Sequence, residues 1–189
     1  MNIKLILIIS FSILYGLFEL LMSRRNQADV KIIKSGDKRS ILLLTICITL
    51  GYWLSFIMAS AKTGRIYHWN ILFLIGSIVA LSGLIVRVTS IIKLKHHFTY
   101  TVVKLENHEL IETGLYKSIR HPGYLGQLMI FLGTSICLSN WASMIIMLIP
   151  VLVGYLNRMN VEEKFMIKEL GQKYIDYRKR TKRLIPMIY

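Results

Sequence analysis

Cysteine, proline and acidic residues are scarce in this chain of 189 residues, which has two Cys, three Pro and ten Asp or Glu. Cys47 and Cys137 both lie inside apolar segments and have no metal-ligand spacing to other residues. We interpret them as small packing residues, and neither a metal site nor a redox compartment follows from them. Internal repeats, tracts of low complexity and long disordered linkers are also absent, so the length supports a single domain over 1–189.

Basic residues exceed acidic ones and give a formal net charge of +14. A basic excess of this size occurs in nucleic-acid-binding proteins, where it gathers into one patch or stripe. Here the lysines and arginines flank apolar segments, as membrane topology and anionic lipid headgroups require. We therefore expect membrane lipids, and no nucleic acid, as partners.

Hydrophobic residues make up 54% of the chain and are gathered into long runs. A bilayer core about 30 Å thick needs about 20 residues of helix. Three runs reach that length, and two shorter ones are separated only by Asn140, which predicts a tight helical hairpin with a kink at Pro150. The five predicted spans are Ile3 to Met22, Ile41 to Ala61, Trp69 to Ile92, Pro122 to Ser139 and Trp141 to Asn157.

Membrane segments of this kind have to be helices, because the bilayer offers no water to satisfy backbone amides. Sheets and soluble doubly wound folds are thereby excluded. The predicted fold class is all-α: a polytopic membrane protein with about five transmembrane helices, a cytoplasmic loop and a C-terminal amphipathic helix. Residues 1–92 supply three N-terminal spans, and residues 93–189 supply the hairpin and the C-terminal helix.

Lysine and arginine fill residues 23–40, residues 93–120 and the chain after Asn157, whereas the two remaining connections carry few. The positive-inside rule places the first three regions in the cytoplasm and the N-terminus outside. The composition, rich in Ile and Lys, favours a prokaryotic plasma membrane. After Asn157 the apolar residues follow a helical period, which predicts an amphipathic helix that continues the fifth span and ends or breaks at Gly171.

The mouth of the fourth span holds the first candidate site. Pro122 suits the first turn of a helix and forces His121 into an extended conformation just outside it. Free amides of Gly123, Tyr124 and Leu125 would make this mouth electropositive, and a carboxylate or phosphate would bind there. The alternative is an interfacial pair of Arg120 and His121 that faces lipid headgroups.

A second polar cluster, Arg158 with Glu162 and Glu163, follows the fifth span and returns to the same membrane face. The two glutamates are expected to begin the C-terminal helix, where part of their value would be to stabilise a helix start. Arg158 can pair with Glu162 one turn away, or it can bind a substrate carboxylate through two of its guanidinium nitrogens. The competing interpretation of this cluster is a solvated helical face.

Two further charges are predicted inside the bilayer, Glu19 on the first span and Arg87 on the third. Leaving either charge unpaired there would cost a few kcal/mol. A structural salt bridge between the two spans, or snorkelling to the surface, is favoured over a catalytic role.

Five short motifs in the second half of the chain together resemble the isoprenylcysteine carboxyl methyltransferase family of integral membrane enzymes. The resemblance covers Phe98 to Pro186, and the order of the motifs around a short helical hairpin carries it. The motifs are His108-Glu-Leu-Ile111, Gly114-x-Tyr116, Arg120-His-Pro-x-Tyr124-x-Gly126, Arg158-x-x-x-Glu162-Glu163 and Gly171-x-x-Tyr174-x-x-Tyr177.

The resemblance implies S-adenosylmethionine as methyl donor, bound on the cytosolic side by the loop before the hairpin and the helix after it. Arg158 would face the acceptor. The residues that would line the cofactor by motif position are His108, Glu109, Leu110, Ile111, Tyr116, His121, Pro122, Gly123, Tyr124 and Glu162.

The methyl acceptor stays open: an isoprenylcysteine-type carboxylate, or another lipophilic or small carboxylate, thiol or amine. A carboxylate needs only to be held, whereas an amine or thiol must lose a proton, and His121 or His108 would then be candidate bases. Two alternatives are a membrane sterol-type reductase that uses NADPH and a non-catalytic membrane scaffold. The sequence pattern gives no indication of oligomeric state.

Overall fold

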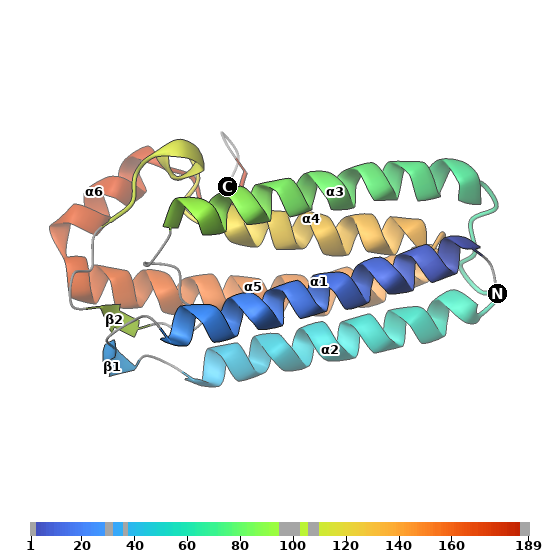
Figure 1. The fold of residues 1–189 in the computed structure, drawn as a ribbon, viewed down its shortest axis with the longest axis horizontal. Coiled ribbons are helices and arrows are strands. Elements are labelled where there is room, and N and C mark those ends of the chain that lie inside the picture. The colour runs from blue at the N-terminus through green and yellow to red at the C-terminus, as the bar shows by residue number, and fades with distance from the viewer. Residues whose placement is uncertain (1–2, 29–31, 36–37, 95–102, 106–109, 186–189) are drawn as a thin grey trace.

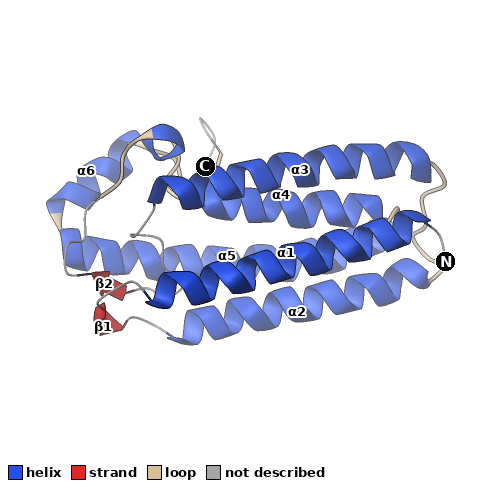
Figure 2. Cartoon of the chain, viewed as in Figure 1, coloured by secondary structure: helices blue, strands red, loops and turns tan. Residues whose placement is uncertain are grey.

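A computed structural model describes residues 3–28, 32–35, 38–94, 103–105 and 110–185, which form a bundle of long helices (Figures 1 and 2). The helices are α1 (Ile3–Ala28), α2 (Lys38–Ser60), α3 (Trp69–Leu94), α4 (Pro122–Cys137), α5 (Trp141–Leu170) and α6 (Gln172–Arg180). A short 3-10 helix, η2 (Gly114–Lys117), precedes α4, and two strands are β1 (Ile32–Ser35) and β2 (Val103–Leu105).

Helices α1 to α5 alternate in direction along the bundle (Figure 1). The end of α3, the start of α4 and the end of α5 lie at the end of the bundle that also holds α6 and the two strands. The polytopic helical prediction is therefore confirmed, including the tight hairpin in which α4 ends at Cys137 and α5 begins at Trp141. Asn140 caps α5 by accepting a hydrogen bond from the Ser143 amide at 3.0 Å.

Four described helices, α1, α2, α3 and α5, are long and apolar enough to cross a membrane. Helix α4 has 16 residues, equivalent to about 24 Å of helix, so the count of five spans is approximate. Helix α5 runs unbroken for 30 residues, with Pro150 inside it, and Gly171 ends it with a φ of 55°. Glu162 and Glu163 thus lie inside a long helix, and the expectation that they begin one is wrong.

Small residues allow α3 and α4 to pack closely along their length. A Cβ atom added at Gly83 would lie 2.6 Å from the carbonyl oxygen of Gly126, and one added at Gly76 would lie 2.5 Å from that of Gly133. Contacts this short require glycine, because a side chain would push the helices apart. This glycine seam holds the start of α4 against α3 and so sets the position of the site at that end.

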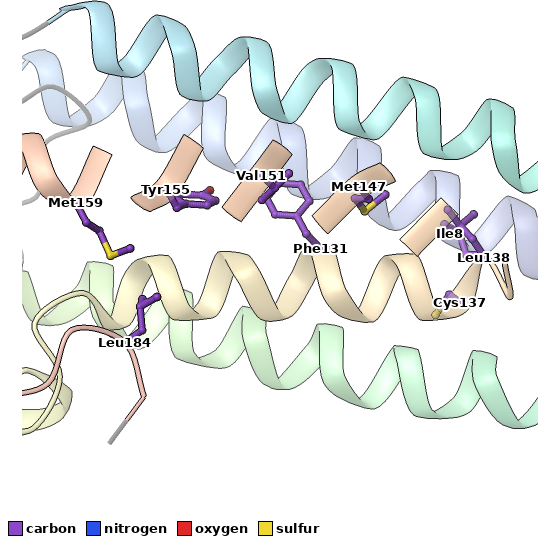
Figure 3. Close-up of a cluster of buried hydrophobic side chains, with 9 residues drawn as sticks. All are labelled: Ile8, Phe131, Cys137, Leu138, Met147, Val151, Tyr155, Met159 and Leu184. Atoms are coloured by element: carbon purple, nitrogen blue, oxygen red, sulfur yellow. The ribbon is translucent and has the colours of Figure 1, made fainter. Parts of the chain in front are cut away.

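Helix α5 forms the core of the bundle, with α2 and α4 packed against it. Its residues Met147, Val151, Tyr155 and Met159 are fully buried, and Phe131 of α4 points toward them (Figure 3).

Strands β1 and β2 form a two-stranded antiparallel pair, which joins the α1–α2 connection to the chain after α3. The all-helical prediction did not include this pairing.

Candidate active site

Pro122 lies in the first turn of α4 and His121 precedes it, as predicted, but the His121 ψ of 56° departs from the extended conformation that was expected. The His121 carbonyl accepts hydrogen bonds from the amides of Tyr124 and Leu125, both at 3.1 Å. The expectation of three free amides is therefore wrong for these two. The third residue is Gly123. Its amide donates no hydrogen bond to a backbone carbonyl within the described parts of the chain.

The two polar clusters meet. The Tyr124 hydroxyl donates a hydrogen bond to Glu162 Oε1 at 2.7 Å, although the residues are 38 positions apart. Arg158 approaches the same carboxylate, with 3.4 Å between its Nη2 and Glu162 Oε1, as the pairing one turn apart predicts. The mouth of α4 and the polar part of α5 thus form one site.

His121 lies between the two glutamates. Its Nδ1 is 3.6 Å from Glu162 Oε2, and its Nε2 is 3.2 Å from Glu163 Oε1. The imidazole stacks on the Tyr124 ring with 5.5 Å between ring centroids. Both ring nitrogens therefore face carboxylates.

Glu163 anchors the chain that follows α6, a role that sequence reasoning missed. Its carboxylate, with a side chain 3% exposed, binds Arg120 Nε at 2.9 Å and Arg183 Nη2 at 2.8 Å. Alongside, the His121 amide donates to the Arg183 carbonyl at 3.1 Å and the Arg120 amide to the Lys182 carbonyl at 2.8 Å. The chain after α6 is thereby bound to the residues just before α4. In the sequence, the basic run at 178–183 is the feature that could have indicated this contact.

Tyr116 lies in η2 and is buried. Its carbonyl accepts a hydrogen bond from the Tyr177 hydroxyl at 2.7 Å. Burial raises the pKa of the Tyr116, Tyr174 and Tyr177 hydroxyls above the ordinary tyrosine value, so these groups stay neutral donors. Tyr116 thus connects η2 to α6.

The segment before η2 is placed only in part. Leu110 and Ile111 are half-buried just ahead of it. His108 and Glu109, which were expected to line the cofactor, lie outside the described residues.

A cavity of about 380 Å³ opens inside the bundle next to this site. Arg158, Tyr124, Arg87 and Glu19 contribute polar groups to its wall. The remaining wall is largely apolar and aromatic and comes from α1, α2, α4 and α5: Phe11, Leu44, Ile48, Tyr52, Ile130, Phe131 and Tyr155. Arg158 is 1% exposed, and its Nη1 also donates to Ser40 Oγ at 2.7 Å, so α2 helps to hold its guanidinium.

Glu19 and Arg87 form the predicted interhelical salt bridge. Arg87 donates from Nε to Glu19 Oε1 at 2.9 Å and from Nη2 to Oε2 at 2.8 Å, and the Tyr15 hydroxyl donates to Oε1 at 2.6 Å. A Cβ atom added at Gly123 would lie 2.9 Å from Arg87 Nη1, so this pair supports the first turn of α4.

Among the described residues, no group of histidine, cysteine and acidic side chains could hold a metal ion.

Comparison with known families adds to this geometry. A family model described as phospholipid methyltransferase matches residues 71–173, more than half of the chain. The chain belongs to the phospholipid methyltransferase family. The match runs from α3 to the start of α6 and includes Arg87, His121, Arg158, Glu162 and Glu163, whereas α1 and α2 lie outside it.

Several curated relatives of this phospholipid methyltransferase family member are named protein-S-isoprenylcysteine O-methyltransferase. The protein from Saccharomyces cerevisiae is 31% identical over 116 residues, which is 60% of this chain and 48% of that protein. Form B from Arabidopsis thaliana is 31% identical over 123 residues, 64% of this chain and 62% of its own length. The match thus spans less than two thirds of either relative.

A solved structure shares the fold. It is titled as the eukaryotic intramembrane Ras methyltransferase isoprenylcysteine carboxyl methyltransferase without a monobody, and superposes with a TM-score of 0.56 at 24% identity. The superposition covers 82% of this chain and 55% of that one. The resemblance inferred from the motifs is confirmed at the level of family and membrane fold.

Proposed function

We propose that this protein is a membrane methyltransferase that moves a methyl group from S-adenosylmethionine to the carboxylate of a lipophilic acceptor. The observation that carries the proposal is the joined cluster of Tyr124, Glu162 and Arg158, which borders a largely apolar cavity inside the bundle. A polar site of this kind is expensive in a membrane protein and so indicates function. The methyltransferase names of the relatives support the same reaction class.

The residues at the mouth of α4 fit the chemical groups of this methyl donor, which carries a carboxylate, an ammonium group, a positively charged sulfur and ribose hydroxyls. Glu162 has a side chain 21% exposed, so its carboxylate can take a further hydrogen bond, unlike Glu163 at 3%. Its oxygens suit the ammonium group or the ribose hydroxyls. The Gly123 amide and Arg158 suit a carboxylate.

Arg158 is the residue that would hold the acceptor carboxylate. Its guanidinium lies on the cavity wall and is fixed by Ser40 and Glu162, so little side-chain entropy is lost when it binds. A planar guanidinium can bind both oxygens of a carboxylate and hold them in a single orientation. The apolar walls from α1, α2 and α4 would then hold the lipophilic part of the acceptor.

The reaction is a displacement in which S-adenosylmethionine, when bound, supplies an electrophilic methyl group on positively charged sulfur. One carbon–oxygen bond forms at the acceptor, one carbon–sulfur bond breaks, the electron pair stays on sulfur, and no proton moves. The protein's task is to align the two reactants and to exclude water, and the largely apolar wall of the cavity favours the exclusion of water. Both nitrogens of His121 face Glu162 and Glu163, which supports a positioning role and an acceptor that needs no base.

Calorimetric titration of the purified protein with S-adenosylmethionine tests the donor. We expect saturable binding that weakens about 10-fold or more in Glu162→Ala and His121→Ala. Asp176→Asn is the matched control, because Asp176 is exposed on α6 and pairs there with Lys179. Failure of the wild-type protein to bind the donor would remove the proposal.

Incubation with labelled S-adenosylmethionine and a total lipid extract, followed by mass spectrometry of the labelled product, identifies the acceptor. A methyl ester is the expected product. An absorbance change of NADPH with a sterol-like substrate would point to the reductase alternative, and a wild-type phenotype in Arg120→Ala, His121→Ala and Glu162→Ala would point to a scaffold.

A further inference from the structure

Three lysines from separate segments meet where α3 ends beside η2. The side chain of Lys93 on α3 lies along Gly114, since a Cβ atom added at Gly114 would lie 3.5 Å from Lys93 Cε. Lys117 follows Gly114 by three residues, which is one turn of a 3-10 helix, so both lie on one face of η2. The Lys182 amide donates to the Ser118 carbonyl at 2.9 Å, which brings the chain after α6 to the end of η2. Lys93, Lys117 and Lys182 together are called the η2 corner below.

The η2 corner holds positive charge without a counter-charge in the described parts of the chain. All three lysines are exposed, and their side chains form no ion pair or hydrogen bond with a described residue. Glu112, which shortly precedes η2, is already bound to Arg180 Nη2 at 2.7 Å. Like charges held close together repel each other, so an anion that enters the corner is bound favourably.

Apolar side chains surround the η2 corner and distinguish it from the other basic surface at this end of the bundle. Exposed large hydrophobic residues come from the same three segments: Ile92, Leu115 and Ile185. The stretch 154–184 exposes no large hydrophobic side chain, although it holds three other exposed lysines: Lys164, Lys168 and Lys173. A free phosphate matches the charge of the corner alone, whereas a charged headgroup with attached hydrocarbon matches both properties.

The outward face of α3 leads from the η2 corner into the membrane-spanning part of the bundle. Leu81, Ile85 and Thr89 precede Lys93 at intervals of four residues, and all are exposed, so they form one row along the helix. The row is about 18 Å long, slightly more than half of a hydrocarbon core about 30 Å thick. An acyl chain can therefore lie along α3 while its headgroup contacts the lysines.

We propose that the η2 corner binds the headgroup of an anionic phospholipid, one acyl chain of which lies along Leu81 and Ile85. The lipid belongs to the leaflet at the α6 end of the bundle, which the positive-inside rule predicts to be cytoplasmic. Basic pockets beside membrane helices bind phosphate-bearing headgroups in this way, because ammonium groups donate to the phosphate oxygens. This inference does not depend on the proposed methyl transfer.

The bound lipid would stabilise the junction between η2 and the chain after α6. Tyr116 lies inside η2, and its carbonyl accepts the hydrogen bond of Tyr177 from α6. Arg183 follows Lys182 directly and binds Glu163 at 2.8 Å. A headgroup that bridges Lys117 and Lys182 would add a third connection to this junction and so resist its unfolding.

Thermal unfolding of the full-length chain tests the proposal in liposomes of phosphatidylcholine alone and of phosphatidylcholine mixed with phosphatidylglycerol. We expect the anionic lipid to raise Tm by about 3 °C, and added salt to reduce this increase. Most of the increase should be lost in the triple variant of the η2 corner: Lys93→Gln, Lys117→Gln and Lys182→Gln.

A second triple variant is the matched control, because it removes the same charge at the same end of the bundle: Lys164→Gln, Lys168→Gln and Lys173→Gln. It should keep most of the Tm increase. Equal losses in the two triple variants would reduce the effect to net charge and overturn the proposal. Inorganic phosphate or polyglutamate, added to phosphatidylcholine liposomes, should leave Tm nearly unchanged. An increase as large as that from phosphatidylglycerol would assign the corner to a free anion or an acidic protein, and would also overturn it.

Tryptophan quenching locates the lipid without relying on stability. In a chain whose three native tryptophans are replaced by phenylalanine, Ile92→Trp reports on the η2 corner. Leu21→Trp, on the exposed face of α1 near the same end of the bundle, is the control. Brominated phosphatidylglycerol, as a minor component in phosphatidylcholine, should quench the tryptophan at 92 more strongly, and the triple variant of the corner should remove the difference. Equal quenching at the two positions would show that no anionic lipid is held at the corner.

Discussion

At the scale of single residues, Glu162 and Glu163 are sequence neighbours with different surroundings. Glu163 is enclosed by Arg120, Arg183 and His121, whereas Glu162 is partly open beside Tyr124 and Arg158. Helix geometry explains the difference, because successive residues point about 100° apart. One carboxylate therefore stabilises the tail, and the other is available to a ligand.

Replacing each glutamate by glutamine separates these roles. Glu163→Gln should lower the free energy of unfolding by about 3 kcal/mol, because it leaves the partly buried Arg120 and Arg183 without their counter-charge. Glu162→Gln should change stability less and weaken S-adenosylmethionine binding about 10-fold. Unfolding in mixed micelles and calorimetry measure the two effects, and a reversed pattern would contradict the assignment.

The pair of Glu19 and Arg87 offers a second test at this scale. Removal of one partner, in Glu19→Leu or Arg87→Met, should destabilise the protein by about 3 kcal/mol, because a buried charge stays behind. The double variant should recover most of that loss, since neither charge remains. A double-mutant cycle on the free energy of unfolding measures the coupling, and strictly additive losses would show that the contact contributes nothing.

At the scale of elements, the glycine seam between α3 and α4 holds the mouth of the site. In Gly126→Ala the new Cβ would lie 2.7 Å from the Gly83 carbonyl oxygen and from the Arg87 amide nitrogen. The helices must separate, so we expect a loss of about 1 to 3 kcal/mol in unfolding free energy.

The matched control for the seam is Gly16→Ala in α1, where an added Cβ meets no atom within 4 Å. Its unfolding free energy should stay level or rise, because alanine favours helix more than glycine. Equal losses in the two variants would mean that close packing of α3 on α4 is not what holds the start of α4.

At the scale of the whole molecule, the arrangement predicts sidedness. The α2–α3 connection and α6 lie at opposite ends of the bundle (Figure 1), and the positive-inside rule predicts from the basic residues that the α6 end faces the cytoplasm. In a background with Cys47→Ala and Cys137→Ala, a membrane-impermeant maleimide should label Lys62→Cys on intact cells and Lys173→Cys only after permeabilisation. The opposite pattern would invert the topology.

Much of this architecture was predictable, because its determinants can be recognised in short stretches of sequence. These determinants are the long apolar runs, the proline at the start of a helix and the charges at one membrane face. The contacts of Tyr124 with Glu162 and of Glu19 with Arg87 follow from placing those elements together. The binding of Arg183 to Glu163 could not be predicted in this way, because it depends on how the chain folds back after Gly171.

The return of the tail to the residues before α4 also has a consequence for biosynthesis. Lys182 and Arg183 accept the backbone hydrogen bonds of Arg120 and His121. The start of α4 therefore stays incomplete until the ribosome has translated these two residues. Inserted helices alone would leave an inactive intermediate in the bilayer. A nonsense mutation between Gly171 and Thr181 should accordingly yield a protein that is targeted and inserted yet unable to turn over substrate.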